Sequence, residues 1–167
     1  LQRIEGVGEH LLHVRARLRH VGQELFLGLA PAVLVLREAD ARLRRDLSNA
    51  LAEFEMVKDV RGLGMLNGIE FQRPSQLGLR LSFEAFGKIH AAMFGQMIVM
   101  RMFREEKFLT QICGNNFNVL KVAPPLIADP EQLNQFVNSV ARVVGLVHSS
   151  RAFWSDALSL ARRAVNV

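Results

Sequence analysis

Two short β-like runs separated by glycines constrain the fold of this chain more than any other feature. The first run is Met56–Arg61 and the second is Met65–Phe71, with Gly62 and Gly64 between them. Glycine adopts positive φ at little cost, so this segment predicts a β-hairpin. Alternation along the second run places Leu66, Gly68 and Glu70 on one face and Met65, Asn67, Ile69 and Phe71 on the other.

A second pair of strands follows further along the chain. We expect strands at 109–112 and 118–122, because Cys113–Asn116 between them has the residue types that turns prefer. Pro124 and Pro125 end the second strand, since proline cannot donate to a strand ladder.

A helix with a clear start signal comes next. Asp129 is a good N-cap, Pro130 suits the first helical position, and Gln132 completes a capping-box spacing. The apolar stripe that follows predicts a helix that ends near His148.

Helical periodicity fills the remaining segments. It predicts helices over 1–24 and 33–54, separated by a break at the apolar, proline-containing run 25–31. After a polar loop at 72–78, a long helix is expected over 83–107, and a short one over 153–164. The stripe of that long helix is expected to be core: Phe86, Ile89, Met93, Met97, Met100 and Phe103. The fold class is therefore α+β, in the broader α/β sense, with about four strands in a small sheet packed with helices.

Composition sets limits on partners and location. The chain has 167 residues, half of them hydrophobic, which fits one domain with a sizeable core. The net charge is +5, but the arginines near the N-terminus lack the interleaved aromatics that single-stranded nucleic acid needs, so no nucleic-acid partner is expected. Cys113 is the only cysteine, which suits the cytoplasm, and no apolar run is long enough to span a membrane. Because the chain begins at Leu1, we expect a fragment.

Catalytic and metal-binding patterns are not found in the sequence. His10 and His13 have helical spacing, but no third ligand at a convincing spacing completes a metal site, so we expect none. Cys113 has no sequence-local histidine partner, and no phosphate-binding or hydrolase motif occurs. Lys121 is the one unusual residue, because it lies between Leu120 and Val122 in an apolar strand. Such a lysine either faces solvent on an edge strand or has a particular role.

Two segments of the sequence resemble a known family. Val60–Glu70 is similar to the V-R-G-x-G-L-M-x-G-I-E segment of class III aminotransferases, which depend on pyridoxal phosphate (PLP). Asn118–Leu126 is similar to the N-x-[IL]-R-x-x-P-P-L segment of the same family. The order and spacing agree over residues 41–147. Segments 94–101, 109–116 and 161–167 most resemble the subgroup associated with hopanoid biosynthesis.

The resemblance implies the C-terminal small domain of a fold type I enzyme that acts as a homodimer with PLP. The Schiff-base lysine would then precede Leu1, and no sequence around Lys58, Lys88, Lys107 or Lys121 resembles its motif. We therefore expect no catalytic or cofactor-binding residue, and no covalently bound PLP, in this chain. Lys121 stands where the family has the arginine that grips the substrate carboxylate, so it is the predicted substrate-binding residue.

The implied organisation has a poorly matched helical segment at 1–40, the small domain at 41–150 and a helical extension at 151–167. The intact enzyme would transfer an amino group from an amino acid donor to a carbonyl acceptor, with a hopanoid side chain as one such acceptor, and this chain alone would be inactive. The alternative is a non-catalytic interaction module with the same fold. A weaker one is nucleic-acid binding through the N-terminal arginines. For a fragment, apolar surface is expected over 1–54 and 83–107.

Overall fold

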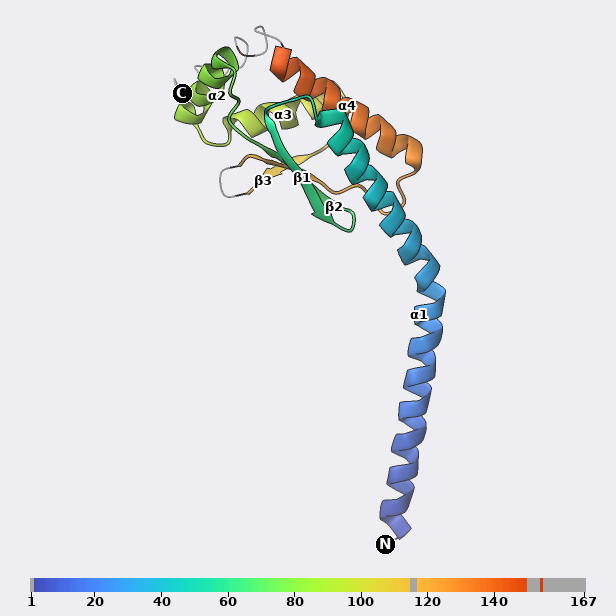
Figure 1. The fold of residues 1–167 in the computed structure, drawn as a ribbon. Helices are drawn as coiled ribbons and strands as arrows, with labels where there is room; N and C mark the ends of the chain where they lie inside the picture. The colour runs from blue at the N-terminus through green and yellow to red at the C-terminus, as the bar shows by residue number, and fades with distance from the viewer. Residues whose placement is uncertain (1, 115–116, 150–153, 155–167) are drawn as a thin grey trace. The chain divides into compact units, whose positions relative to one another are not determined.

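The chain divides into two units in a computed structural model that describes residues 2–114, 117–149 and 154. The units are Leu1–Glu38 and Ala39–Val167. The elements are α1 (Gln2–Leu51), β1 (Val57–Leu63), β2 (Leu66–Phe71), α2 (Leu77–Ile89), α3 (Met93–Arg104), β3 (Gln111–Cys113), β4 (Val119–Val122) and α4 (Pro130–Ser149). This is the predicted α+β class, with four strands and flanking helices (Figure 1).

One helix replaces the first two that the sequence predicts. α1 runs without interruption from Gln2 to Leu51, so the predicted break at 25–31 is wrong. Pro31 removes a single backbone hydrogen bond, and the leucines and alanines around it are strong helix formers. The proline signal therefore does not end the helix in this segment.

The predicted hairpin is confirmed. β1 and β2 pair antiparallel, with Leu63 opposite Leu66 at the turn, and Gly64 there has φ +58°. A Cβ on Gly62 would lie 2.3 Å from Asn67 Oδ1 and 2.5 Å from the Leu66 carbonyl oxygen, so only glycine fits. The predicted alternation also holds, because Asn67, Ile69 and Phe71 are buried.

The four strands form one sheet in the order β1-β2-β4-β3. β4, which the two prolines follow, pairs antiparallel with β2, so the two segments that resemble the aminotransferase family are neighbours. β3 pairs antiparallel with the other side of β4 and is an edge strand of the sheet. β4 is therefore an inner strand, which corrects the alternative that places Lys121 on an edge strand.

Two helices occupy the segment where one long helix is predicted over 83–107. α2 begins earlier, at Leu77, and ends at Ile89, and α3 starts at Met93. The break comes at His90, where the Ala92 N–H donates to His90 Nδ1 at 3.1 Å and so leaves the helical pattern. Phe86 and Met97 of the predicted core stripe are buried, but Phe103 is 57% exposed, so its assignment to the core is wrong.

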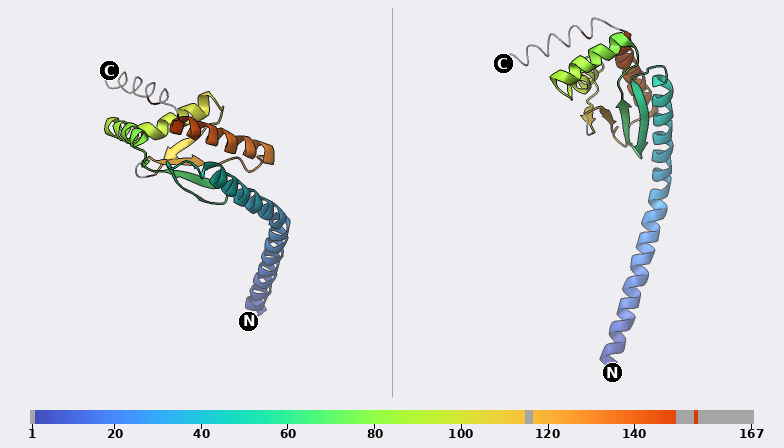
Figure 2. Two further views of the ribbon diagram at one scale, coloured as in Figure 1. Left: turned by 45° about the horizontal axis from the view of Figure 1, so that its top comes forward. Right: turned by 60° about the vertical axis from the view of Figure 1, so that its left-hand side comes forward.

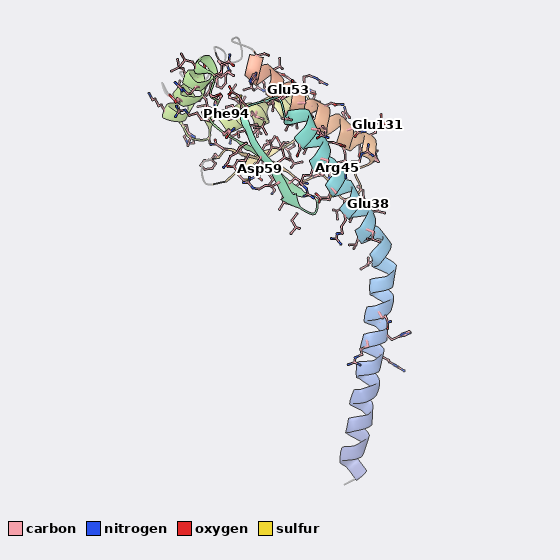
Figure 3. The ribbon with its side chains drawn as sticks, in the orientation of Figure 1. Glu38, Arg45, Glu53, Asp59, Phe94 and Glu131 are labelled. Carbon is pink, nitrogen blue, oxygen red and sulfur yellow. The ribbon has the colours of Figure 1, made fainter. Side chains whose placement is uncertain are left out.

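Helices α3 and α4 lie on the same side of the sheet, as the left view of Figure 2 shows. The capping box predicted for α4 is present: the Gln132 N–H donates to Asp129 Oδ1 at 2.8 Å, and the Asp129 N–H donates to Gln132 Oε1 at 3.1 Å. Phe94 of α3, labelled in Figure 3, packs its ring 5.4 Å from that of Phe71 on β2. These contacts join helices and sheet in one apolar core.

The C-terminal end of α1 supplies a further layer of that core. Leu43, Leu47 and Leu51 recur at four-residue steps and are at most 1% exposed. Trp154, the one tryptophan, is buried, and its Nε1 donates to the Val147 carbonyl oxygen at 3.0 Å. The helix predicted over 153–164 otherwise lies outside the described residues. Within the described part of the chain, no helix combines the length and apolarity needed to cross a membrane.

Candidate functional site

A cleft of about 450 Å³ lies where three segments meet: the end of β4, the α3–β3 connection and the first turns of α4. Its walls are mixed, with apolar rings and prolines beside a few polar side chains. The lining residues are Glu106, Lys107, Phe108, Leu109, Thr110, Lys121, Val122, Ala123, Pro124, Pro125, Ala128, Gln132, Gln135 and Phe136. Apolar walls with a few convergent polar groups are typical of small-molecule sites.

Lys121 is part of the wall of this cleft. In the sheet ladder it stands opposite Gly68 of β2 on one side and Gln111 of β3 on the other. Its neighbours Leu120 and Val122 are buried, whereas Lys121 itself is partly exposed. Its ammonium makes no hydrogen bond or ion pair with any residue that the structure describes. The position has therefore a cationic group without a protein counter-ion among the described residues.

The one carboxylate among the lining residues of the cleft has partners other than Lys121. Glu106 accepts hydrogen bonds from Ser139 Oγ at 2.7 Å and from Arg142 Nη1 at 2.7 and 2.8 Å. Its side chain is 9% exposed. These bonds tie the α3–β3 connection to α4 and leave Glu106 committed to them. A ligand anion would meet no competing ion pair at Lys121.

Two further polar groups of the cleft were not indicated by the sequence. Lys107 has φ +64°, and its Nζ donates to the Arg104 carbonyl oxygen at 2.6 Å. Thr110 Oγ1 is buried and has no hydrogen-bond partner among the described residues. Nothing in the local sequence distinguishes Thr110 from an ordinary strand threonine.

A buried polar cluster lies at a different place, between α1 and the hairpin turn. Asp40 and Asn67 are 5% and 2% exposed, and Asn67 Nδ2 donates to Asp40 Oδ1 at 3.0 Å. Arg44 donates to Asp40 Oδ2 and to the Gly62 carbonyl oxygen, both at 2.8 Å. Because every member is bonded to another, this cluster fixes the hairpin against the helix and is structural in character.

Ionic contacts also cross the hairpin. Lys58 Nζ lies 2.7 Å from Glu70 Oε1, and Arg61 bonds both Asp59 and Glu70. The hydrogen bond from Lys58, with a second from Arg61, holds the pKa of the Glu70 carboxyl below its usual range. Glu70 therefore stays ionised on this face of the hairpin, and Arg61 bridges the two strands.

The described residues do not form a complete PLP site. PLP needs an imine-forming lysine, a carboxylate or arginine at the pyridine nitrogen, and donors for its phosphate. The cleft offers Lys121, but its one carboxylate, Glu106, is held by Ser139 and Arg142. The first amide groups of α4 are partly satisfied by Asp129. In the described part of the chain, no three histidine, cysteine or acidic side chains are grouped to hold a metal.

Comparison with known proteins places the fold. No known protein family matches the sequence. The chain is similar to the ornithine aminotransferase of Toxoplasma gondii ME49, with 20% identity and a TM-score of 0.51 over 68% of this chain and 23% of that one. A second T. gondii ornithine aminotransferase structure was crystallised in the presence of oxidised glutathione and shows partial occupancy of PLP at its active site. It has 19% sequence identity and a TM-score of 0.51, over 70% of this chain and 23% of that one. An Arthrobacter phospholyase in complex with phosphoethanolamine has 24% sequence identity and a TM-score of 0.49. The match covers 78% of this chain and 27% of the phospholyase.

The likeness to the two T. gondii structures defines a class of fold. The chain spans about a quarter of the length of the solved structures that it matches. Its four-stranded antiparallel sheet with packed helices is the fold of that part of an aminotransferase.

Proposed function

We propose that the chain is the C-terminal small domain of a class III PLP-dependent aminotransferase. The observation that carries the proposal is the pairing of β2 with β4, in which Gly68 stands opposite Lys121. It joins in space the two sequence segments, 60–70 and 118–126, that resemble this family. The intact enzyme transfers an amino group from an amino acid donor to a carbonyl acceptor.

Lys121 is proposed to bind a carboxylate of the substrate. It lines the cleft, and no described residue neutralises its ammonium. An ammonium supplies a point charge with rotatable donors, whereas the family's arginine supplies a planar two-donor fork. Lys121 therefore attracts the anion but constrains its orientation less.

PLP and the lysine that binds it come, in this proposal, from a large domain outside this chain, in a cytoplasmic homodimer. When bound, PLP supplies the electron sink of the reaction. The residues described here contribute one wall of the pocket. The chain alone then binds no PLP covalently and catalyses no transfer.

A bulky apolar acceptor, such as a hopanoid side chain, is the proposed substrate of the intact enzyme. The walls of the cleft include Phe108 and Phe136, and its lining residue Leu109 is 84% exposed. Leu126 and Ile127, between the lining residues Pro125 and Ala128, are 63% and 93% exposed. Apolar surface beside a cationic group suits an amphiphilic substrate.

The test joins the full chain to the large domain of a class III aminotransferase and follows amino transfer. Lys121→Met is expected to raise KM for the carboxylate-bearing substrate about tenfold with a smaller change in kcat, because a charge-assisted contact is lost. Lys121→Arg should retain the low KM, and Lys88→Met on α2 is the matched control.

Two results would contradict the proposal. One is an unchanged KM in Lys121→Met. The other is the visible absorption band of a lysine–PLP imine when the isolated chain is mixed with PLP, with the PLP group still attached after borohydride reduces that imine. A chain that supports no transfer but forms a stable complex with another protein would favour the interaction module.

A further inference from the structure

The first unit of the chain carries a seven-residue repeat that is apolar at nine of its ten positions, Gly28 being the exception. Ile4, Leu11, Leu18, Leu25 and Ala32 recur at seven-residue steps, and so do Val7, Val14, Val21, Gly28 and Val35. The two sets alternate at steps of three and four residues, which is the spacing of a coiled coil. The set that begins at Ile4 takes the a positions and the set that begins at Val7 takes the d positions. Because α1 is continuous over this segment, the repeat makes one seam along the helix.

The seam residues whose side chains the structure describes are exposed in the single chain. Val21 and Val35, both at d positions, are 62% and 64% exposed, and Leu29 beside the seam is 53% exposed. Gly22, Gly28 and Pro31 also lower the intrinsic stability of the helix. A helix with such breakers depends on packing for most of its stability. The seam therefore needs an apolar surface to cover it.

We propose that the seam packs against the same seam of a second copy, with the two helices antiparallel. Charges at the flanking g positions support this direction, since they are Arg3 and Arg17 in the first half and Glu24 and Glu38 in the second. Antiparallel pairing brings Arg17 to Glu24 of the second copy, and Arg3 to its Glu38. Opposite charges at such flanks select partner and orientation.

Side-chain size supports the same direction. The same antiparallel register puts Leu11 against Gly28 of the second copy, and Leu18 against its Val21. A parallel pair in register would instead stack Gly28 on Gly28 and Ala32 on Ala32, which leaves two adjacent layers poorly filled. It would also bring His10 close to Arg15 of the second copy.

The first test measures the mass of the full chain by sedimentation over a range of concentrations. The chain is expected to be dimeric, and Val21→Asp to weaken the dimer about a hundredfold, because it buries an unpaired charge. Val33→Asp is the matched control, since Val33 is 51% exposed on the same helix but lies off the seam. It should leave the dimer intact, and Trp154 fluorescence should report a folded second unit in both variants.

The second test fixes the direction of the helices. Arg17→Glu places two glutamates against each other at both symmetry-related contacts near the middle of the pair and is expected to weaken the dimer about tenfold. Glu24→Arg should do the same, and the double variant should recover the wild-type dimer. In a parallel pair these residues do not meet, so the double variant would show no recovery.

Three outcomes overturn the inference: a monomeric wild-type chain, a dimer that Val21→Asp leaves intact, or charge variants without mutual rescue. None of them bears on amino transfer, because Lys121 and the cleft belong to the second unit. A failed coiled coil and a failed transaminase are thus distinguishable.

Discussion

Both ends of α1 have apolar residues at helical spacing, but those of one end are buried and the described ones of the other end are exposed. In the C-terminal end, Leu43, Leu47 and Leu51 are at most 1% exposed, because the sheet and α4 supply the rest of one core. In the earlier part, Val21 and Val35 are more than 60% exposed. A repeat of apolar residues therefore predicts a helix and the side that must be covered. It does not predict what covers that side.

Polar residues distinguish the two ends more clearly than the apolar ones do. Asp40 and Arg44 form hydrogen bonds to Asn67 and to the hairpin backbone, which fixes the helix in one register on its neighbour. Geometry of this kind is specific to one packing, whereas an apolar seam accepts several. Substitutions in each region can test this difference.

The largest effect is expected in the core. Leu47→Ala should lower the free energy of unfolding of the second unit by about 3 kcal/mol, since it leaves a cavity in a fully packed position. Val33→Ala in the exposed part of α1 should change it by less than about 0.5 kcal/mol. Urea denaturation followed by Trp154 fluorescence measures both. Equal losses would contradict the contrast between the two ends.

Asn67→Ala removes the centre of the buried polar cluster. We expect a loss of about 2 kcal/mol, because Asp40 Oδ1 then stays buried without its donor. The double variant Asp40→Ala/Asn67→Ala should lose less than the sum of the two single losses if the cluster acts as a unit. Additive losses in the same urea titration would argue against a coupled cluster.

Two glycine-to-alanine substitutions should change stability in opposite directions. Gly62→Ala forces a Cβ against Asn67 and the Leu66 backbone and should destabilise the second unit by about 1–3 kcal/mol. A Cβ at Gly22 would meet nothing within 4 Å. Gly22→Ala should therefore raise the helix content of the first unit, because alanine is about 1 kcal/mol more favourable than glycine in a helix. Circular dichroism and urea titration separate the two results. A loss of helix content in Gly22→Ala would contradict the open environment of that glycine.

The smallest effect concerns acid. The hydroxyl of Ser75, then the N–H groups of Gln76 and Ser75, bond the Glu55 carboxylate ahead of α2 and lower the pKa of that carboxyl. A lower pKa in the folded chain stabilises it at neutral pH, and this contribution fades as the pH falls through the folded pKa. Glu55→Gln should therefore show a shallower loss of stability toward acid pH than the wild type. Glu53→Gln, at an exposed position of the second unit, is the control, and identical acid profiles for Glu55→Gln and the wild type would contradict the role of Glu55.

Much of the fold could be predicted from short-range signals. The hairpin, the two later strands and the capped α4 each depend on residues within a few positions of one another, such as Gly64 or Asp129 with Gln132. The two wrong predictions of helix boundaries involve a choice between local signals. Pro31 suggested a break, but α1 continues through it, while His90 interrupts a run whose apolar stripe suggested continuity.

The candidate site was predicted in part. Lys121 could be singled out because a charge in an apolar strand is unusual, and the cleft that it lines is consistent with a ligand-binding role, which remains a proposal. Thr110 and the Glu106–Arg142 pair could not be found this way. Glu106 and Arg142 are far apart in the sequence and meet only because α4 folds back over the α3–β3 connection.

The inner position of β4 has a consequence for selectivity. Strands on both sides hold the main chain at Lys121, so its Cα is a fixed anchor while the side chain is a flexible four-carbon tether. Discrimination among anions at this wall would then depend on how far they sit from the anchor and little on the angle at which they approach.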